Sequence, residues 1–162
     1  MAKKTEKPKT MLGWHCLRPS MRTACGHEPA WRVREVRSII GRPQLCIHGY
    51  HACRQAPMAV IWWDAVGTGL SQPFRLCRVR LSGLRIDDQT KSVAHTRKLI
   101  WALSPSETRD VMIRFRREMC AHSYGRLLEL AWDRPAYGDK ANAILERLAH
   151  EAHREQIAAR KK

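Results

Sequence analysis

Acidic residues are scarce in this sequence. Thirty lysines and arginines stand against fifteen aspartates and glutamates, which leaves a formal charge of +15 at pH 7 in 162 residues. A surplus of this size favours contact with polyanions or with a strongly acidic protein surface. Nucleic acid is therefore the first partner that the composition suggests, and a basic surface that only keeps the protein soluble is the alternative.

Long apolar runs are absent as well. No apolar stretch approaches the length of about 20 residues that a membrane-spanning helix needs. The N-terminal region lacks the apolar segment and the small-residue cleavage site of a secretory signal. We therefore expect a cytoplasmic protein without membrane contact, in which the six cysteines are thiols rather than disulfides.

The length, the composition and the pattern of the sequence predict one domain in three parts. The length and a hydrophobic share of 44% suit a single globular core. We expect a disordered basic arm at 1–10, an α+β core at 11–103 and a helical region of the same domain at 104–162. The arm has little to bury and either contacts phosphates or acts as a solubilising tail. Its basic residues are Lys3, Lys4, Lys7 and Lys9.

The α+β core is predicted to contain a small, mostly antiparallel sheet with one packed helix. Apolar and alternating patterns indicate strands at 11–17, 31–36 and 74–81, the last interrupted at 82–83. Gly49 indicates a turn, and Pro57 suits the first position of a helix that ends at 67–69. A polar turn is expected at 87–89.

The C-terminal third is predicted to be helical. Residues 104–107, Ser-Pro-Ser-Glu, match a capping box with proline at the first helical position. The apolar residues that follow recur at three- and four-residue spacing, as in an amphipathic helix. A second helix is expected at 124–132, and a last one after Gly138 and Asp139.

Cysteine and histidine gather between Leu45 and Trp63. Cys46, His48, His51 and Cys53 are of the types that bind zinc, but the sequence contains no Cys-x2-Cys pair. Buried thiols and hydrogen-bonded imidazoles are therefore the simpler interpretation, and no cofactor is expected. A cysteine nucleophile activated by a neighbouring histidine and Arg54 is a further possibility, although no third, orienting group is evident.

Two groups of arginines are candidates for nucleic-acid contact. One lies on the expected strand at 74–81 and the other on the first C-terminal helix. With the tryptophans at positions 31, 62, 63 and 101 they would line a groove in which phosphates meet cations and bases stack on rings. The alternative is that the tryptophans are core and the arginines form a solvated face. The arginines are Arg75, Arg78, Arg80, Arg109, Arg116 and Arg117.

The order of several motifs resembles that of an uncharacterised domain family of phage and bacterial proteins. These motifs are Gly-Tyr-His-Ala-Cys at 49–53, Pro57 before a short helix, Cys-Arg-Val-Arg-Leu-Ser-Gly at 77–83, and Asp88 before Lys-Ser-Val-Ala at 91–94. The match covers roughly 11–132. It implies a phage or mobile-element origin, and hence the host cytoplasm, but no particular activity.

A more distant resemblance is to the ADP-ribosyltransferases. It is carried by Trp14 and His15 on the first strand and by the Gly-Tyr-His turn at 49–51 before a helix. It implies that His15 would hold the ribose and that Tyr50 would stack on nicotinamide. The family also has a glutamate on a later strand, where this chain has arginines. Transferase activity would therefore lack the carboxylate that stabilises developing positive charge.

Taken together, the sequence favours a non-enzymatic phage or mobile-element accessory protein. We expect it to bind nucleic acid or a nucleic-acid-handling complex, for instance as a counter-defence protein that inhibits a CRISPR effector. An enzyme similar to ADP-ribosyltransferases and a zinc-stabilised interaction module are the alternatives.

Overall fold

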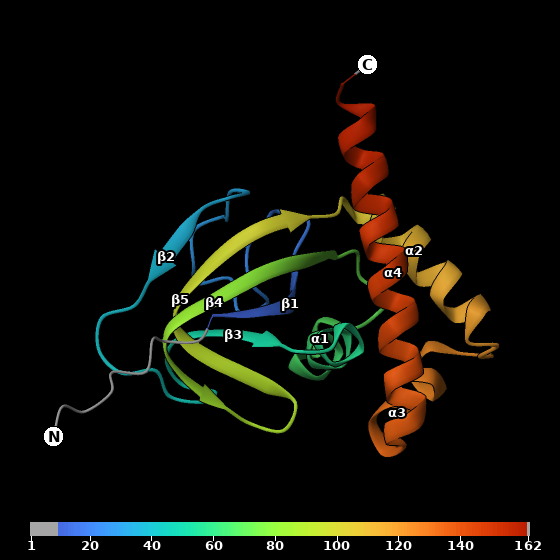
Figure 1. Cartoon of the computed structure of the whole chain (residues 1–162), viewed down its shortest axis with the longest axis horizontal. Helices are drawn as coiled ribbons and strands as arrows, with labels where there is room; N and C mark the ends of the chain where they lie inside the picture. Colours follow the sequence, from blue (N-terminus) through green and yellow to red (C-terminus); the bar gives the residue numbers. More distant parts are fainter. Residues whose placement is uncertain (1–9, 162) are drawn as a thin grey trace, which may run out of the picture.

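The structure, a computed structural model, describes residues 10–161. Its N-terminal part is a five-stranded sheet, and helices follow in the C-terminal part (Figure 1). The strands are β1 (Met11–Leu17), β2 (Val36–Ser38), β3 (Tyr50–Cys53), β4 (Arg75–Asp87) and β5 (Lys91–Ala102). The helices are α1 (Ala56–Trp63), the π-helical turn η1 (Asp64–Thr68), α2 (Pro105–Glu118), α3 (Tyr124–Asp133) and α4 (Pro135–Ala159). The predicted α+β class with an antiparallel sheet and a helical C-terminal third is confirmed.

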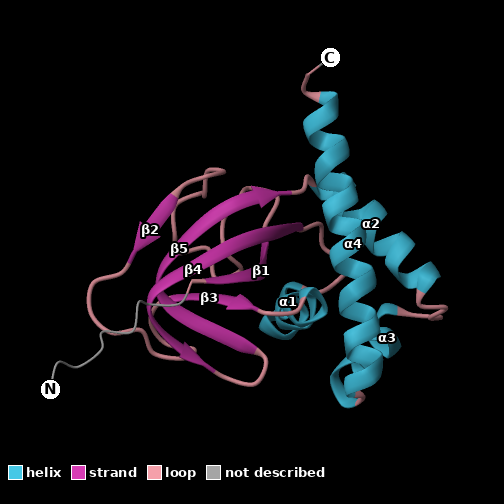
Figure 2. Cartoon of the chain, in the orientation of Figure 1, coloured by secondary structure: helices cyan, strands magenta, loops and turns pink. Residues whose placement is uncertain are grey.

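The sheet curves into a barrel, as the wrapped strands in Figure 2 show. β1 pairs with β3 and β4, and β5 also pairs with β3 and β4, so these four strands form a closed ring. β2 adds to β5 through residues 36–38. All of these pairings are antiparallel. Closure satisfies the backbone groups that an open sheet would expose at its edges.

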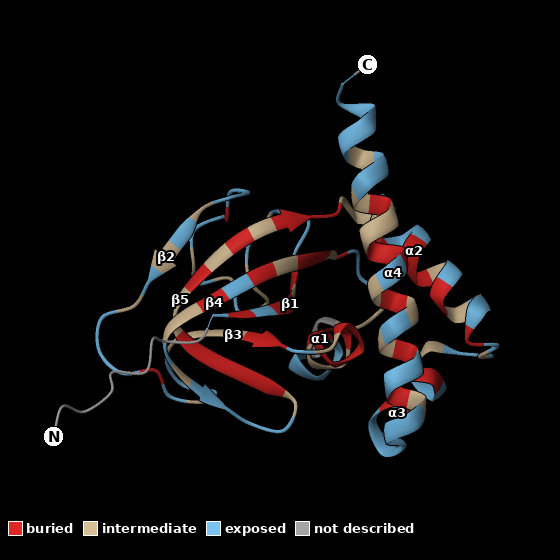
Figure 3. Cartoon of the chain, in the orientation of Figure 1, coloured by how far each residue is buried: buried red, intermediate tan, exposed pale blue. Residues whose placement is uncertain are grey.

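Alternation along β1 divides the buried side chains between two cores. Met11 and Leu17 face the barrel interior, whereas Trp14 and Cys16 face the helices. The helix-facing core also contains Phe115 of α2 and residues of α1, α3 and α4. In Figure 3 the buried positions follow β4, β5 and the inner faces of the helices, and the last turns of α4 are exposed. The sheet and the C-terminal helices therefore share the helix-facing core, and the second core lies inside the barrel.

The capping box predicted for α2 is present. The backbone N–H of Glu107 donates to Ser104 Oγ at 3.2 Å, and the backbone N–H of Ser104 donates to Glu107 Oε2 at 2.6 Å. Val111, Met112 and Phe115 are buried on the side of α2 that faces the core. The position of α2 is therefore fixed locally by its cap and globally by its apolar stripe.

Two predicted strands differ from the structure, and one strand was missed. The strand expected at 31–36 is only the three-residue β2, because Trp31 turns into the barrel and Arg34 has a left-handed φ of 72° that ends the extended run. The strand at 74–81 does not stop at 82–83 but continues to Asp87 through an irregularity in its pairing, with Gly83 at φ 77°. β5 was not predicted at all.

The last helix begins earlier than predicted. α4 starts at Pro135, and Gly138 lies inside its first turns. A Cβ on Gly138 would lie 2.7 Å from the backbone oxygen of Ala131 in α3. Gly138 therefore allows α3 and α4 to approach closely rather than preceding the helix.

No helix within residues 10–161 combines the length and the apolar character that crossing a membrane requires. The six cysteines are free thiols, of which Cys16, Cys53 and Cys77 are buried and the other three are exposed.

Candidate functional site

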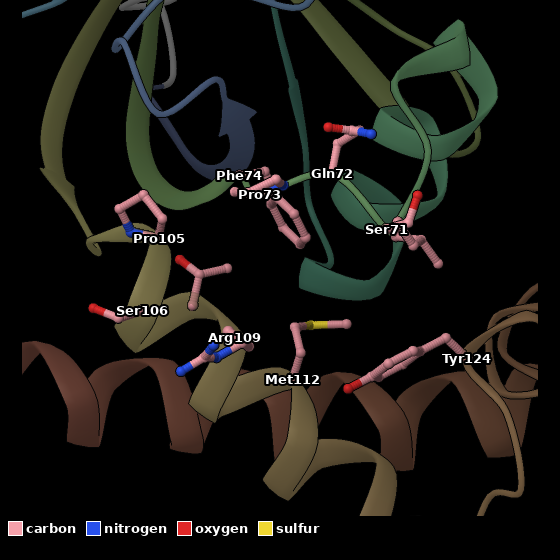
Figure 4. Close-up of a pocket in the computed structure, with 11 residues that line it drawn as sticks. Ser71, Gln72, Pro73, Phe74, Pro105, Ser106, Arg109, Met112 and Tyr124 are labelled. Carbon is pink, nitrogen blue, oxygen red and sulfur yellow. The ribbon is translucent and has the colours of Figure 1, made fainter.

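An open cleft of about 340 Å³ lies between α2, the start of α3 and the segment that leads into β4. We call it the α2–α3 cleft. Figure 4 shows Arg109, Met112 and Tyr124 along one side of it and Phe74 across from them. The lining residues are Leu70, Ser71, Gln72, Pro73, Phe74, Pro105, Ser106, Thr108, Arg109, Met112 and Tyr124.

The α2 cap places Arg109 at this cleft. Arg109 follows the capping box by about half a turn, and its side chain is 74% exposed with Asp110 3.8 Å away. An ion pair that is this exposed is worth little in water, so it does not hold the guanidinium in place. Arg109 is therefore available to an anionic ligand.

A second arginine of α2 lies over one aromatic ring of the cleft. The guanidinium carbon of Arg116 is 5.2 Å from the ring centroid of Tyr124, within the range of a cation–π contact. Burial raises the pKa of Tyr124, so its hydroxyl is neutral at physiological pH. The cleft thus has the exposed guanidinium of Arg109, hydroxyl groups, and a tyrosine ring that makes a cation–π contact with Arg116, which is not itself a lining residue. This combination suits a ligand with both an anionic group and a flat ring.

The arginines predicted on the strand have different environments. Arg75 donates to the backbone oxygens of Pro19 and Leu103, at 2.9 and 3.2 Å. The guanidinium of Arg78 lies 4.5 Å from the Trp14 ring centroid and 3.5 Å from the carboxylate of Glu146. Both guanidinium groups are engaged by contacts within the protein and are therefore not free for a ligand.

The remaining predicted basic residues divide between the exposed surface and the undescribed terminus. Arg80 and Arg117 are exposed. The four lysines of the predicted arm, Lys3, Lys4, Lys7 and Lys9, lie outside the described residues.

The tryptophans do not line a groove in the way the sequence allowed. Trp31, Trp63 and Trp101 are 2%, 4% and 6% exposed and belong to the two cores. Trp62 is half-buried beneath the ammonium of Lys91. The aromatic residues that line the cleft are instead Phe74 and Tyr124. Tyr124 was not predicted, because its proximity to Arg116 depends on the turn between α2 and α3.

The barrel interior holds the residues that the transferase resemblance singled out. Tyr50 packs edge-on against Trp31, with ring centroids 5.5 Å apart, and the guanidinium of Arg97 lies 5.0 Å from the Tyr50 ring. His15 points into the same interior, and its Nε2 has no hydrogen-bond partner within residues 10–161. Neither His15 nor Tyr50 lines the α2–α3 cleft. Their proposed roles in binding a dinucleotide stay predictions.

Arg97 is the most deeply buried charge of this interior. It is 2% exposed, donates to the backbone oxygen of His51 at 3.2 Å and lies 3.6 Å from the carboxylate of Glu28. Desolvation lowers its pKa to about 10, partly offset by Glu28. Arg97 therefore remains charged at physiological pH and is held by its surroundings rather than presented to a partner.

Three histidines make the stability of the fold dependent on pH. Burial is the first cause that lowers the pKa of His15, of His51 (to about 4) and of His150. Each of them takes up a proton more readily in the unfolded chain, so acid favours unfolding. Stability is expected to fall as the pH drops below about 6.5, by at most about 1.4 kcal/mol per pH unit for the buried His15 and by less for the partly exposed His51 and His150, whose charges the solvent screens.

Urea titrations between about pH 7 and pH 5 measure this dependence. His150→Phe, which keeps a ring beside Trp14 and Trp101, should reduce the slope. His27→Gln, at an exposed position, should leave it unchanged. Equal urea midpoints for the wild-type protein at both ends of the range would contradict the prediction.

The four residues considered for zinc do not point their ligand atoms at one common site. Cys53 is buried, and burial raises its pKa to about 12. His48 contacts the backbone oxygen of Ile40, whereas His51 Nε2 accepts a hydrogen bond from the backbone N–H of Cys46. Across residues 10–161, no three or more histidine, cysteine, aspartate or glutamate side chains are placed to share a metal ion.

No protein-family model, curated protein or solved structure matches the chain. The two resemblances inferred from motifs therefore stay predictions, and the site has to be interpreted from its own geometry.

Proposed function

We propose that this protein binds nucleic acid, or a complex that handles nucleic acid, and that the α2–α3 cleft is a contact site. The observation that carries the proposal is the cation–π pair of Arg116 and the cleft residue Tyr124, on the same helix-turn region as the exposed Arg109. Arginines neutralise phosphates, and a ring that already carries a guanidinium on one side resembles the platforms on which unpaired bases stack. The net charge of +15 adds a long-range attraction for the same ligand.

The shape of the cleft favours a single strand over a duplex. Its volume of about 340 Å³ lies at the lower end of the range for small-molecule sites, enough for one flat ring with its attached groups. Bases in a duplex are stacked on one another and do not present their faces, whereas those of a single strand do. We therefore expect single-stranded DNA or RNA to bind more tightly than duplex DNA of the same sequence.

Fluorescence anisotropy with labelled single-stranded DNA, RNA and duplex DNA at two salt concentrations tests the proposal. Affinity should fall steeply as salt increases, because binding releases counterions. Arg109→Glu/Arg116→Glu should weaken single-strand binding by at least about tenfold.

The matched control is Arg32→Glu/Arg42→Glu, which removes the same charge from exposed positions flanking β2. This pair should weaken binding much less than the cleft pair. Absence of binding at low salt would contradict the proposal, and equal losses from the two pairs would contradict the assignment to the cleft. The phage origin and the counter-defence role stay predictions, for which co-purification from the native host is the direct test.

A further inference from the structure

Cys46 occupies a backbone conformation that an L-residue rarely adopts. Its φ is 62° in the tight turn between Gln44 and His48, whose ends are joined by a hydrogen bond from the Gln44 N–H to the His48 oxygen at 2.7 Å. Glycine would fit such a position without steric cost, whereas a residue with a Cβ is strained there. Cys46 carries an exposed thiol at this turn.

The Cys46 thiol contacts the buried ammonium of Lys91. Lys91, the first residue of β5, is 8% exposed, and its Nζ donates to Cys46 Sγ at 2.8 Å. Trp62 also covers the ammonium, with its ring centroid 3.6 Å from Nζ. A buried ammonium needs a compensating partner. Within residues 10–161 no carboxylate lies within 4.0 Å of Lys91, so the sulfur is that partner.

His51 also holds the turn at 44–48 in place. Its Nε2 accepts a hydrogen bond from the Cys46 backbone N–H at 3.0 Å. Burial, helped by the charges of Lys91 and Arg97, lowers the pKa of His51 to about 4. The ring is therefore neutral at physiological pH and keeps its lone pair for this bond. The sulfur is held against Lys91 by backbone anchoring as well as by the ammonium itself.

We propose that Cys46 is a covalent modification site for soft electrophiles, peroxides in particular, and that Lys91 activates its sulfur. An adjacent ammonium stabilises negative charge on a sulfur, and the anion is the nucleophilic form. In the reaction with hydrogen peroxide, the Cys46 sulfur attacks one peroxide oxygen, an S–O bond forms and the O–O bond breaks. The sulfur is oxidised by two electrons to a sulfenic acid, and the second oxygen leaves as hydroxide, which takes up a proton to become water. The site is independent of the α2–α3 cleft.

The chain contains its own controls for this proposal. Cys25 and Cys120 are also exposed, but only Cys46 has a lysine nitrogen against its sulfur in the described part of the chain. With a limiting amount of iodoacetamide near neutral pH, peptide mass spectrometry should show Cys46 alkylated about tenfold faster than either control thiol. After brief exposure to hydrogen peroxide, dimedone should label Cys46 before the other two. Equal rates for the three exposed thiols would overturn the proposal.

Two variants assign the activation to Lys91. Lys91→Met keeps an unbranched apolar side chain beneath Trp62 and removes the charge, so it should reduce the Cys46 rate to that of the control thiols. Lys91→Arg retains the charge and should keep part of the acceleration. Circular dichroism and the rates at Cys25 and Cys120 show whether each variant is folded. A folded Lys91→Met protein with an unchanged Cys46 rate would overturn the role of Lys91. The comparison of Cys46 with Cys25 and Cys120 uses the wild-type protein, so it does not depend on whether a variant folds.

Discussion

Trp14→Ala is expected to destabilise the protein by about 3 to 5 kcal/mol. Trp14 is 0% exposed, so its removal loses the transfer free energy of a large ring and leaves a cavity that the rigid barrel cannot close. The ring also contacts Trp101 and His150 edge-on, at centroid distances of 5.6 and 5.7 Å. Its Nε1 donates to Glu146 in α4 at 2.7 Å. The substitution therefore removes contacts that join β1 to α4.

Chemical denaturation followed by circular dichroism measures this effect. The matched control is Trp132→Ala on α3, where the side chain is 50% exposed and its loss should cost less than about 1 kcal/mol. Trp14→Phe should lie between the two, since it keeps an aromatic ring but loses the bond to Glu146. Similar losses for Trp14→Ala and Trp132→Ala would show that Trp14 does not anchor α4.

Gly49→Ala is expected to destabilise the protein by about 2 to 4 kcal/mol. Gly49 has a φ of 118°, which disfavours any residue with a Cβ. An added Cβ would also lie 2.7 Å from Cγ2 of the buried Val93 and 3.2 Å from the backbone oxygen of Ala94. Both neighbours belong to β5, so relief of the clash would disturb the pairing of β3 with β5.

The control for Gly49 is Gly125→Ala. Gly125 is in the first turn of α3, and a Cβ there meets no atom within 4 Å. Because alanine favours helix more than glycine does, this change should be neutral or stabilising by up to about 1 kcal/mol. Thermal unfolding of both variants beside the wild-type protein gives the comparison. A Gly49→Ala protein as stable as the wild type would mean that the turn adapts without cost.

Features set by neighbouring residues could be predicted from the sequence. The α2 cap depends on residues 104–107 alone, and α1 begins at Ala56, one residue before the Pro57 that was predicted to begin it. The change of direction before β3 was predicted from Gly49, although the turn itself lies at residues 45–47 and Gly49 is a bend just after it. In each case the residues that create the feature lie within a few positions of one another, so their spacing carries the information.

β5 could not be predicted in the same way. Its sequence contains Lys91 and Arg97, which interrupt an apolar pattern, yet both are buried. Lys91 is covered by Trp62, and Arg97 by Trp31 and Tyr50. These rings come from segments far away in the chain, and they make burial of a long basic side chain tolerable by covering its charge. Nothing within β5 signals their presence.

The candidate site was predicted in part. Arg109 and Arg116 were singled out as basic residues off the apolar stripe of a helix, which is a local property. Tyr124 and the segment before β4 were not singled out. They come close to α2 only through the turn between α2 and α3 and through the closure of the sheet. The pairing of Cys46 with Lys91 likewise requires the turn at 44–48 to fold over the start of β5.

Composition and short-range spacing are sufficient to predict the net charge, the α+β class and the helices with clear end signals. Which basic side chains are free depends instead on the packing of the folded chain. Arg75 and Arg78 are engaged by backbone oxygens, Trp14 and Glu146, whereas Arg109 stays exposed. The physical reason is that a long cationic side chain binds whatever acceptor or ring the fold brings within its reach, and that neighbour is set by the packing of distant segments.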